Sequence, residues 1–350
     1  MRIVVVGATG NVGTAVLRRL AAARLAGEGV DGGDLQVVGV ARRLPDARVA
    51  PYDVAVWHAL DVGDPGVVPQ LAAVLQGADA VVHLAWALQP THDVSAQRRT
   101  DVDGQAHVLE AAVRAGVGHV VVASSVGAYH GVDAAGKRTP VDESWPATGI
   151  PTATYSKHKA ENEAALDAFA EAHPTITVSR LRPGLVFQRN VAAELRGLFL
   201  GHLVPMRIVR WVRWAMLPLP YPFVFQAVHA DDLADAYWRV LDQRAAGAFN
   251  VAAAPVLTPP RIARALGMRG AVRVPLRLLR GLVTLTWRLR LQPTDAGWID
   301  IAAGVPVMRT DRARTELGWE PRHTAEDALR ELVGGFADGA NVPASGPLQG

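Results

Sequence analysis

Two side chains, Tyr155 and Lys159, could carry acid–base chemistry because of their types and their spacing. They lie four residues apart in the segment TATYSKHKAENE. Residues 155–169 are rich in Ala, Glu and Lys, which favour helix, and positions four apart share one helix face. An ammonium about 4 Å from a phenolate interacts with it by up to ~4 kcal/mol at an effective dielectric near ~20. Such a neighbour would bring a phenol, which titrates near ~10, towards neutral pH. The alternative is a surface helix with a chance spacing.

A glycine-rich turn follows the first apolar segment, RIVVV, and precedes a predicted helix at about residues 11–26. Glycine lets the backbone approach a diphosphate, and the first N–H groups of the helix can bind it. The position between the first strand and the first helix makes this signal much more specific than the glycines alone. The residues that we expect to bind a dinucleotide here are Gly7, Thr9, Gly10, Asn11, Val12 and Gly13.

Short apolar segments alternate with Ala-rich helical stretches through the first half of the chain. The further apolar segments are LQVVGVA, VAVWHAL, DAVVHLA, HVVVAS and TITVSRLR, and a further helix is expected near residues 97–115. Continuous apolar strands separated by helices indicate a parallel sheet that is covered on both faces. The predicted fold is therefore α/β, a Rossmann-type doubly wound parallel sheet.

The second and third predicted strands are followed by charged residues. Arg42 and Arg43 follow the second strand, where sites that prefer NAD usually place an acid. Arginine there can bind the 2′-phosphate of NADP, so we expect NADP to be preferred and NAD to be possible. Solvated loop arginines are the alternative, and nearby Asp46 argues against the preference. Asp61 at the end of the third strand is a cofactor candidate, whereas Asp64, before a proline, is explained as a helix N-cap.

Composition limits the classes of partner. The 350 residues contain no cysteine, which excludes disulfides, thiol nucleophiles and Cys-bound zinc, and is consistent with a cytoplasmic location. The net charge of +3 and the lack of a dense basic cluster argue against nucleic acid. The sequence has no stretch of 18 apolar residues without a charge, so we expect no membrane span. We expect a small-molecule substrate, no metal, and a homodimer.

These features together resemble the extended short-chain dehydrogenase/reductases, the group that includes nucleotide-sugar epimerases and dehydratases. The resemblance covers nearly the whole chain, and the segments that carry it, in the family's order, are GATGNVG, ALDVGD, VVHLAW, VVASSVGAYH, YSKHK, RLRPGLVF, VHADDLADAY, GAFNVA and RTELGWEPRH. It implies a Rossmann domain followed by a smaller C-terminal substrate domain. The expected boundaries are 1–183 for the Rossmann domain, to which 226–250 returns, 184–225 and 251–335 for the substrate domain, and 336–350 for a flexible tail.

The resemblance also implies roles for individual residues. Tyr155 corresponds to the general acid/base, and Lys159 to the lysine that lowers its pKa and holds the nicotinamide ribose. Ser125 corresponds to the serine that orients the reacting oxygen, with its neighbour Ser124 ranked second. Further cofactor contacts are assigned to Val62, Leu84, Ala85 and Pro183, and substrate contacts to Trp86, Ser125, Tyr129, Phe187 and Gln188.

Three features depart from the pattern of the sugar-nucleotide enzymes. Val126-Gly127 stands where dehydratases carry an Asp-Glu pair, and Pro183 stands where a diphosphate-binding asparagine is frequent. Asp101 replaces a common asparagine, which puts a water-relay role there in doubt. We therefore predict an NAD(P)-dependent oxidoreductase acting on an alcohol or ketone carbon of a hydrophobic molecule. The alternatives are a nucleotide-sugar 4-epimerase that retains NAD and a non-catalytic dinucleotide-sensing protein, which the presence of both Tyr155 and Lys159 disfavours.

Two basic and apolar stretches, residues 205–225 and 272–292, mark the second half. The first has an arginine stripe at 207, 210 and 213 and resembles an amphipathic helix. Lid or interdomain packing is favoured over a membrane surface, because prolines interrupt the segment. These arginines also count against an apolar substrate, because they could clamp a diphosphate if they face inward.

Overall fold

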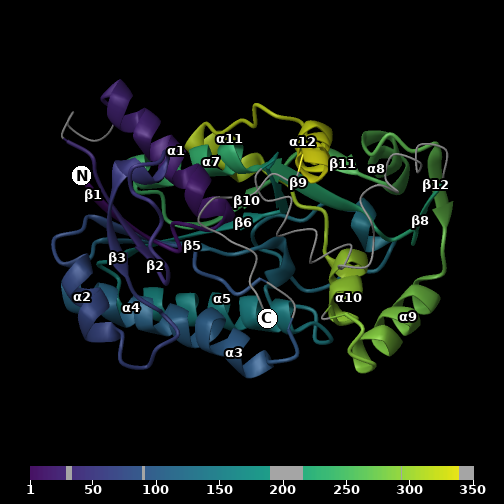
Figure 1. Cartoon of the computed structure of the whole chain (residues 1–350), viewed down its shortest axis with the longest axis horizontal. Coiled ribbons are helices and arrows are strands. Elements are labelled where there is room, and N and C mark those ends of the chain that lie inside the picture. Colours follow the sequence, from purple (N-terminus) through teal and green to yellow (C-terminus); the bar gives the residue numbers. More distant parts are fainter. Residues whose placement is uncertain (29–33, 89–90, 190–215, 293, 339–350) are drawn as a thin grey trace.

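The computed structural model describes residues 1–28, 34–88, 91–189, 216–292 and 294–338. Its main feature is a seven-stranded sheet in the order β10-β6-β5-β4-β1-β2-β3, in which every neighbouring pair is parallel (Figure 1). The strands are β1 (Arg2–Val6), β2 (Gln36–Ala41), β3 (Ala55–Ala59), β4 (Ala80–His83), β5 (His119–Ala123), β6 (Thr177–Pro183) and β10 (Gly247–Val251). The doubly wound parallel sheet expected from the sequence is confirmed.

Helices cover both faces of this sheet. One face carries α1 (Asn11–Ala26), α7 (Ala230–Gln243) and α11 (Asp311–Leu317), and the other carries α2 (Val68–Leu75), α4 (Gly104–Ala115) and α5 (Thr154–Ala172) (Figure 1). Successive residues of a strand point to opposite faces. Ile3 and Val5 accordingly pack against the first set of helices, and Val4 and Val6 pack against the second. Burial on both faces explains why the strands are continuously apolar.

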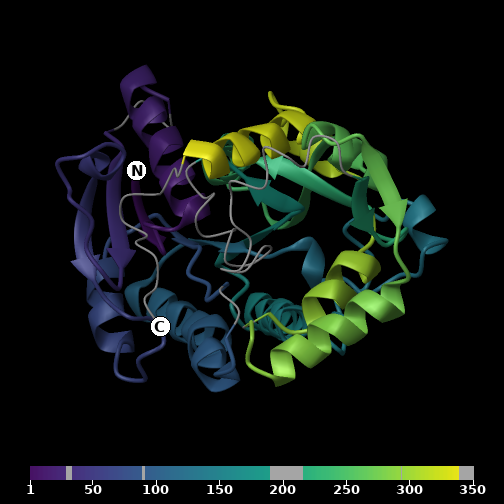
Figure 2. The ribbon, with the colours of Figure 1, turned by 45° about the vertical axis from the view of Figure 1, so that its right-hand side comes forward.

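The second half builds two small sheets beside the main one. The first has the order β11-β9-β7 and the second pairs β12 with β8. Their strands are β7 (Leu185–Phe187), β8 (Met216–Leu219), β9 (Phe225–His229), β11 (Ala253–Leu257) and β12 (Gly270–Arg273). The accompanying helices are α8 (Pro259–Ala265), α9 (Leu276–Arg288), α10 (Gly297–Gly304) and α12 (Ala325–Asp338). Figure 2 shows these elements gathered on one side of the main sheet.

The helix expected near residues 97–115 has a more complex form. It begins as α3 (Val94–Arg98), passes through a π-helical turn, η3 (Arg99–Asp103), and continues as α4. π-Helical turns inside helices are frequent at functional sites. Here the turn contains Asp101, which is only 2% exposed. Short 3-10 turns occur at η2 (Tyr52–Val54), η4 (Val126–Ala128) and η5 (Gly136–Arg138).

Two local expectations differ from the structure. Asp64 does not cap a helix, because α2 begins at Val68 and Asp64 Oδ1 accepts from Gly66 N at 2.8 Å, forming a turn. The tail was expected to begin at residue 336, but α12 continues to Asp338. Residues 339–350 lie outside the described part of the chain.

The first basic stretch can be judged only in part. Residues 190–215, with the arginine stripe, lie outside the described residues. Residues 216–219 form strand β8 and not a helix. The second stretch forms β12 and α9, and none of the α9 side chains is buried. Packing does not account for the exposed leucines of α9, of which Leu278 is 68% exposed, whereas Leu276 and Leu279 are half-buried.

Candidate active site

The glycine-rich turn fits a bound dinucleotide because its glycines permit a backbone that other residues could not adopt. Gly7 has φ +83°, and a Cβ on it would lie 2.5 Å from Ala85 N. A Cβ on Gly13 would lie 2.4 Å from Gly7 O, so this glycine lets α1 pack closely on β1. Gly10 is the N-cap of α1 and has no side chain to bind the first N–H groups of that helix. Those groups can therefore bind an anion.

Side chains from the second half support this turn. Gln188 Nε2 donates to Asn11 O at 2.8 Å and to Asn11 Oδ1 at 2.7 Å, and Gln188 Oε1 accepts from Arg18 at 2.8 Å. Gln188 was expected to contact the substrate, but the structure places it against the glycine-rich turn. Thr9 lies in the connection between β1 and α1, and Val12 lies in the first turn of α1.

The remaining cofactor candidates follow the carboxyl ends of parallel strands, where such sheets bind ligands. Arg42 and Arg43 follow β2 and are exposed, and Asp61 follows β3 and is exposed. Asp46, which weakened the NADP preference, is hydrogen-bonded by Arg48 at 2.9 Å, and this bond lowers the pKa of Asp46. The other candidates lie after β3 and β4 and at the end of β6, and they are Val62, Leu84, Ala85 and Pro183.

Tyr155 lies on α5 between two tryptophan rings. Its ring centroid is 5.5 Å from that of Trp86 and 5.2 Å from that of Trp298. Burial raises the pKa of Tyr155 to about 12, the hydrogen bond with the Ser125 side chain opposes this, and the charge of Asp101 adds to it. The structure therefore brings Ser125 and Tyr155 together, with a phenol that stays protonated at neutral pH.

Lys159 lies one turn further along α5 and is only 4% exposed. Its Nζ donates to Ala123 O at 2.7 Å and lies 3.4 Å from the centroid of the Trp86 ring, but 6.0 Å from that of Tyr155. Burial lowers the pKa of Lys159 to about 7, and the carboxylates of Asp101 and Glu163 oppose this. In this geometry burial, and not the ammonium, dominates the pKa of Tyr155, contrary to the expectation that Lys159 lowers it.

The two adjacent serines point to different partners. Ser125 Oγ accepts from Gly127 N at 3.0 Å, and the Tyr155 ring lies on the same side of Gly127. Ser124 Oγ donates to Glu163 Oε1, which belongs to a buried ionic network. Only the Ser125 hydroxyl therefore faces Tyr155.

The Glu163 network also contains Tyr129. Glu163 accepts from Arg182 Nε at 2.9 Å and from Arg180 at 2.7 Å. Tyr129 is fully buried, its hydroxyl donates to Asn250 Oδ1 at 2.7 Å, and it accepts from Arg182 at 2.9 Å. Tyr129 was expected to contact the substrate, but it holds strands of the main sheet together.

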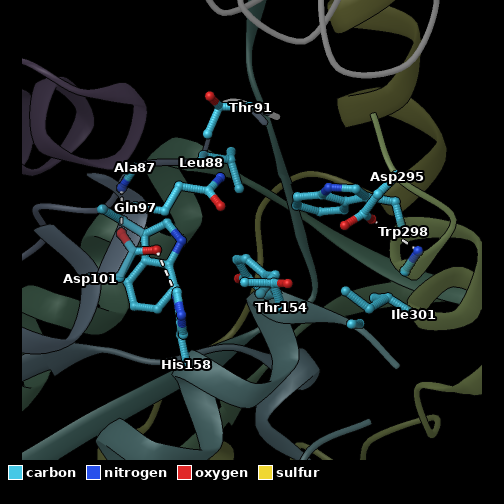
Figure 3. A pocket seen from close by; sticks show the side chains of 14 residues that line it. Ala87, Leu88, Thr91, Gln97, Asp101, Thr154, His158, Asp295, Trp298 and Ile301 are labelled. Carbon is cyan, nitrogen blue, oxygen red and sulfur yellow. Dashed lines mark hydrogen bonds and ion pairs between the residues drawn. The ribbon is translucent and has the colours of Figure 1, made fainter. Parts of the chain in front are cut away.

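Tyr155 is one of the residues that line a pocket, and Figure 3 shows this pocket from close by. Leu88, Trp298 and Ile301 supply apolar walls, and Asp101 and His158 supply a polar end. Trp86 lies in this lining as expected, whereas Phe187 packs in the core of the small sheets.

Sequence reasoning missed His158 and Trp298 as lining residues. His158 was visible inside YSKHK, three residues after Tyr155 and therefore on the same side of the helix. Trp298 gave no signal, because α10 reaches the pocket only through the tertiary fold.

The described residues contain neither a metal-binding cluster nor a membrane-spanning helix. No group of three or more His, Asp or Glu side chains there could hold a metal ion. In the same part of the chain, no helix combines the length and apolar character that crossing a membrane requires.

The sequence profile described as the NAD dependent epimerase/dehydratase family matches residues 3–252. The chain belongs to this family. The expected resemblance to extended short-chain dehydrogenase/reductases is thereby confirmed, together with the NAD-binding fold.

Curated relatives of this epimerase/dehydratase family member are distant. An uncharacterized protein of Mycobacterium tuberculosis strain H37Rv is 28% identical over 336 residues, which cover 95% of this chain and 30% of that protein. The chain thus spans about 30% of the length of the first relatives that it matches. A 3-diazoavenalumate denitrifying reductase of Streptomyces sp. is 28% identical over 346 residues, which cover 92% of this chain and 97% of the reductase.

Solved structures of the family share the fold. DesIV, a dTDP-glucose 4,6-dehydratase of Streptomyces venezuelae with NAD and TYD bound, has a TM-score of 0.68 at 22% identity and is covered over 97% of both chains. The UDP-glucose 4-epimerase of Thermotoga maritima, solved with UDP-glucose, has a TM-score of 0.67 at 19% identity, with 97% of this chain and 99% of that chain covered. At these identities the likeness shows the fold and not the reaction.

Proposed function

We propose that this family member is an NAD(P)-dependent oxidoreductase that acts on an alcohol or ketone carbon of a hydrophobic small molecule. The observation that carries the proposal is that the side chains of Ser125 and Tyr155 both lie against Gly127, beside a pocket with aromatic walls. The similarity to the denitrifying reductase of Streptomyces sp. is consistent with net reduction.

The proposed chemistry divides between the cofactor and the chain. When bound, the nicotinamide cofactor supplies or takes up the hydride. Ser125 Oγ holds the oxygen of the reacting carbon by a hydrogen bond. Tyr155 Oη donates the proton to that oxygen in reduction and takes it back in oxidation, and its raised pKa favours the protonated form that reduction requires. Lys159 supplies a buried positive charge behind Trp86, and with a pKa of about 7 it is charged mainly below neutral pH.

We propose that NADP is the preferred cofactor. The exposed guanidinium groups of Arg42 and Arg43, directly after β2, can bind a 2′-phosphate. The counter-indication from Asp46 is weakened, because that carboxylate is bound by Arg48.

The apolar part of the pocket lining supports this substrate class. It consists of the rings of Trp86 and Trp298 and the side chain of Ile301, while polar side chains such as Gln97 and Asp295 line the rest. An apolar site needs shape and a few polar anchors, whereas a nucleotide-sugar site must pair many buried polar groups, each of which costs ~1–3 kcal/mol if left unpaired.

The second candidate function is a nucleotide-sugar 4-epimerase that retains NAD. The family and the likeness to an epimerase fold favour it. Such an enzyme would use Ser125, Tyr155 and Lys159 to oxidise and then reduce one carbon, with no net consumption of cofactor.

Two measurements separate these candidates. An oxidoreductase should consume NADPH steadily with a member of a panel of hydrophobic ketones, whereas an epimerase should purify with NAD bound and show no net redox change. In a thermal-shift panel run with NADP, a ligand at one hundred times its dissociation constant stabilises the native state by ~2.7 kcal/mol. If a nucleotide-sugar gives the large shift and the hydrophobic compounds give none, the epimerase replaces the oxidoreductase.

A further inference from the structure

Asp101 and His158 form a buried pair in the same pocket, and the proposed oxidoreduction does not use them. His158 Nδ1 lies 3.3 Å from Asp101 Oδ2, and the two side chains are 7% and 3% exposed. Asp101 Oδ1 accepts from Ala87 N at 2.7 Å, which fixes the carboxylate in the π-helical turn η3. Figure 3 shows both contacts at the polar end of the pocket.

The partner of Nδ1 determines what the other ring nitrogen can do. A carboxylate can only accept hydrogen bonds, so Nδ1 of His158 carries the hydrogen, and Nε2 of the neutral ring is an acceptor. The hydrogen bond that His158 makes in the described part of the chain uses Nδ1. Nε2 is therefore the ring nitrogen that a ligand would meet in the pocket that His158 lines.

We propose that His158, oriented by Asp101, is a second acid–base site of this pocket and accepts a proton from a phenolic or enolic hydroxyl group of the bound substrate. In this step the O–H bond breaks and an Nε2–H bond forms. The oxygen keeps the electron pair, and Asp101 stabilises the resulting imidazolium. The inference deepens the proposed function, because it assigns a substrate class to the pocket at Tyr155.

The chemistry of the site selects this class of hydroxyl. An ordinary phenol titrates near ~10 and an imidazole near ~6.5, so the site selects a phenol or enol whose acidity is raised by a conjugated carbonyl group, which brings the two values closer together. An aliphatic hydroxyl is a much weaker acid and gains little from a base. The rings of Trp86, Tyr155 and Trp298 add flat apolar surfaces against which a conjugated ring can pack.

The competing explanation is structural, because the pair also ties the backbone at Ala87 to α5. Two variants distinguish these roles. In His158→Asn the side-chain amide can still donate to Asp101, but the group equivalent to Nε2 is removed. In Asp101→Asn the amide oxygen can still accept from Ala87 N. The amide no longer requires a hydrogen on Nδ1 of His158, so Nε2 of His158 is no longer held as an acceptor.

The experiment uses the full chain saturated with NAD⁺ or NADP⁺, with no reductant present. 4-Hydroxyacetophenone and 4-methoxyacetophenone are titrated separately, and both the dissociation constant and the phenolate absorbance are measured. We expect the wild type to bind the hydroxyl compound about tenfold more tightly, as one favourable hydrogen bond allows, and to show a phenolate band at a pH where the free compound is mainly neutral. His158→Asn should lose both the preference and the band while binding the methoxy compound unchanged. Asp101→Asn should lose the band.

Three outcomes would overturn the inference: a wild type that binds neither compound, a wild type that binds both equally without a phenolate band, or a His158→Asn variant that keeps the band. The fate of the proposed function is read separately from NADPH consumption with ketones. If the wild type turns over ketones but His158→Asn binds both acetophenones as the wild type does, this inference is rejected and the proposed function stands. A phenolate band without any turnover rejects the oxidoreductase alone.

Discussion

The ring of Tyr155 occupies the space into which a side chain at Gly127 would project. A Cβ on Gly127 would lie 2.7 Å from Tyr155 Cε1 and 3.4 Å from Ser125 Oγ. A carboxylate at this position would therefore displace the tyrosine from its contact with Ser125. This geometry agrees with the sequence, which has Val126-Gly127 where sugar-nucleotide dehydratases resembling this chain carry an acid pair, and it disfavours water elimination as the reaction.

Tyr155→Phe should lower turnover by roughly 10²–10⁴-fold, the usual contribution of a general acid/base, with cofactor binding nearly unchanged. The matched control is Tyr129→Phe, which removes a buried hydroxyl from the Arg182 network and should lower thermal stability without a comparable loss of turnover. Steady-state kinetics and a cofactor titration test this. Retention of most of the turnover in Tyr155→Phe would remove this residue from the mechanism.

The two serines should respond differently to replacement by alanine. Ser125→Ala removes the group that holds the reacting oxygen and should lower kcat by about 10²–10³-fold, as loss of one such donor does. Ser124→Ala should keep most of kcat but destabilise the fold by roughly 1–3 kcal/mol, because buried Glu163 loses a donor. Kinetics and chemical denaturation of both variants provide the test, and the reverse pattern would exchange their roles.

Glu163 should make stability fall in acid. Burial opposes its ionisation, but Arg182, Arg180 and Ser124 together lower the pKa of its carboxyl from 4.5 to about 2. A lowered pKa means that this stabilisation is complete above about 4.5 and is lost as the pH falls from about 4.5 to about 2, a change of roughly 3 kcal/mol. Denaturation curves across this range measure it.

The matched variants for Glu163 use the same change in two environments. Glu163→Gln should destabilise the protein by roughly 3–5 kcal/mol at pH 7, because it leaves buried arginines without their partner. Glu110→Gln removes one partner of an exposed pair with Arg114 and should change stability by less than about 1 kcal/mol. Equal effects of the two substitutions would contradict the assigned importance of the buried network.

Lys159→Met should stabilise the protein while removing activity. Burial lowers the pKa of this lysine from 10.5 to about 7, so the unfolded chain binds the additional proton between these values, and wild-type stability should rise with pH across that window. The variant should lose this slope and gain about 1–4 kcal/mol at pH 6, as replacement of buried ionic groups by apolar ones can do. Thermal melts at pH 6 and pH 10 check the prediction, which fails if the variant is less stable at pH 6.

Replacing Arg42 and Arg43 together by alanine should weaken NADP binding about 10–100-fold, since hydrogen bonds to charged groups contribute ~1.5–3 kcal/mol. NAD binding should change little. Arg48→Ala, which removes an exposed arginine already paired with Asp46, is the control. Fluorescence titrations with each cofactor measure the effect, and equal losses for both cofactors would show that the arginines do not recognise the 2′-phosphate.

Local sequence signals predicted much of the fold. Strands and helices were recognisable because apolar periodicity and helix propensity depend on near neighbours, and the helix starting at Asn11 ends at Ala26 as expected. The glycine-rich turn was also readable, since φ +83° at Gly7 is a local requirement. The start of α2 and the π-helical turn at Asp101 were missed, because tertiary packing overrode the local pattern.

The sequence by itself determined the parallel sheet, the dinucleotide turn and the spacing of Tyr155 and Lys159, because each depends on residues that are close in the chain. Only the tertiary structure decided which of Ser124 and Ser125 faces Tyr155, and that Trp298 closes the pocket. It also decided that Asp101 meets His158 and that burial lowers the pKa of Lys159. The physical reason is that burial, hydrogen-bond partners and electrostatic surroundings are set by segments that pack together from distant parts of the chain.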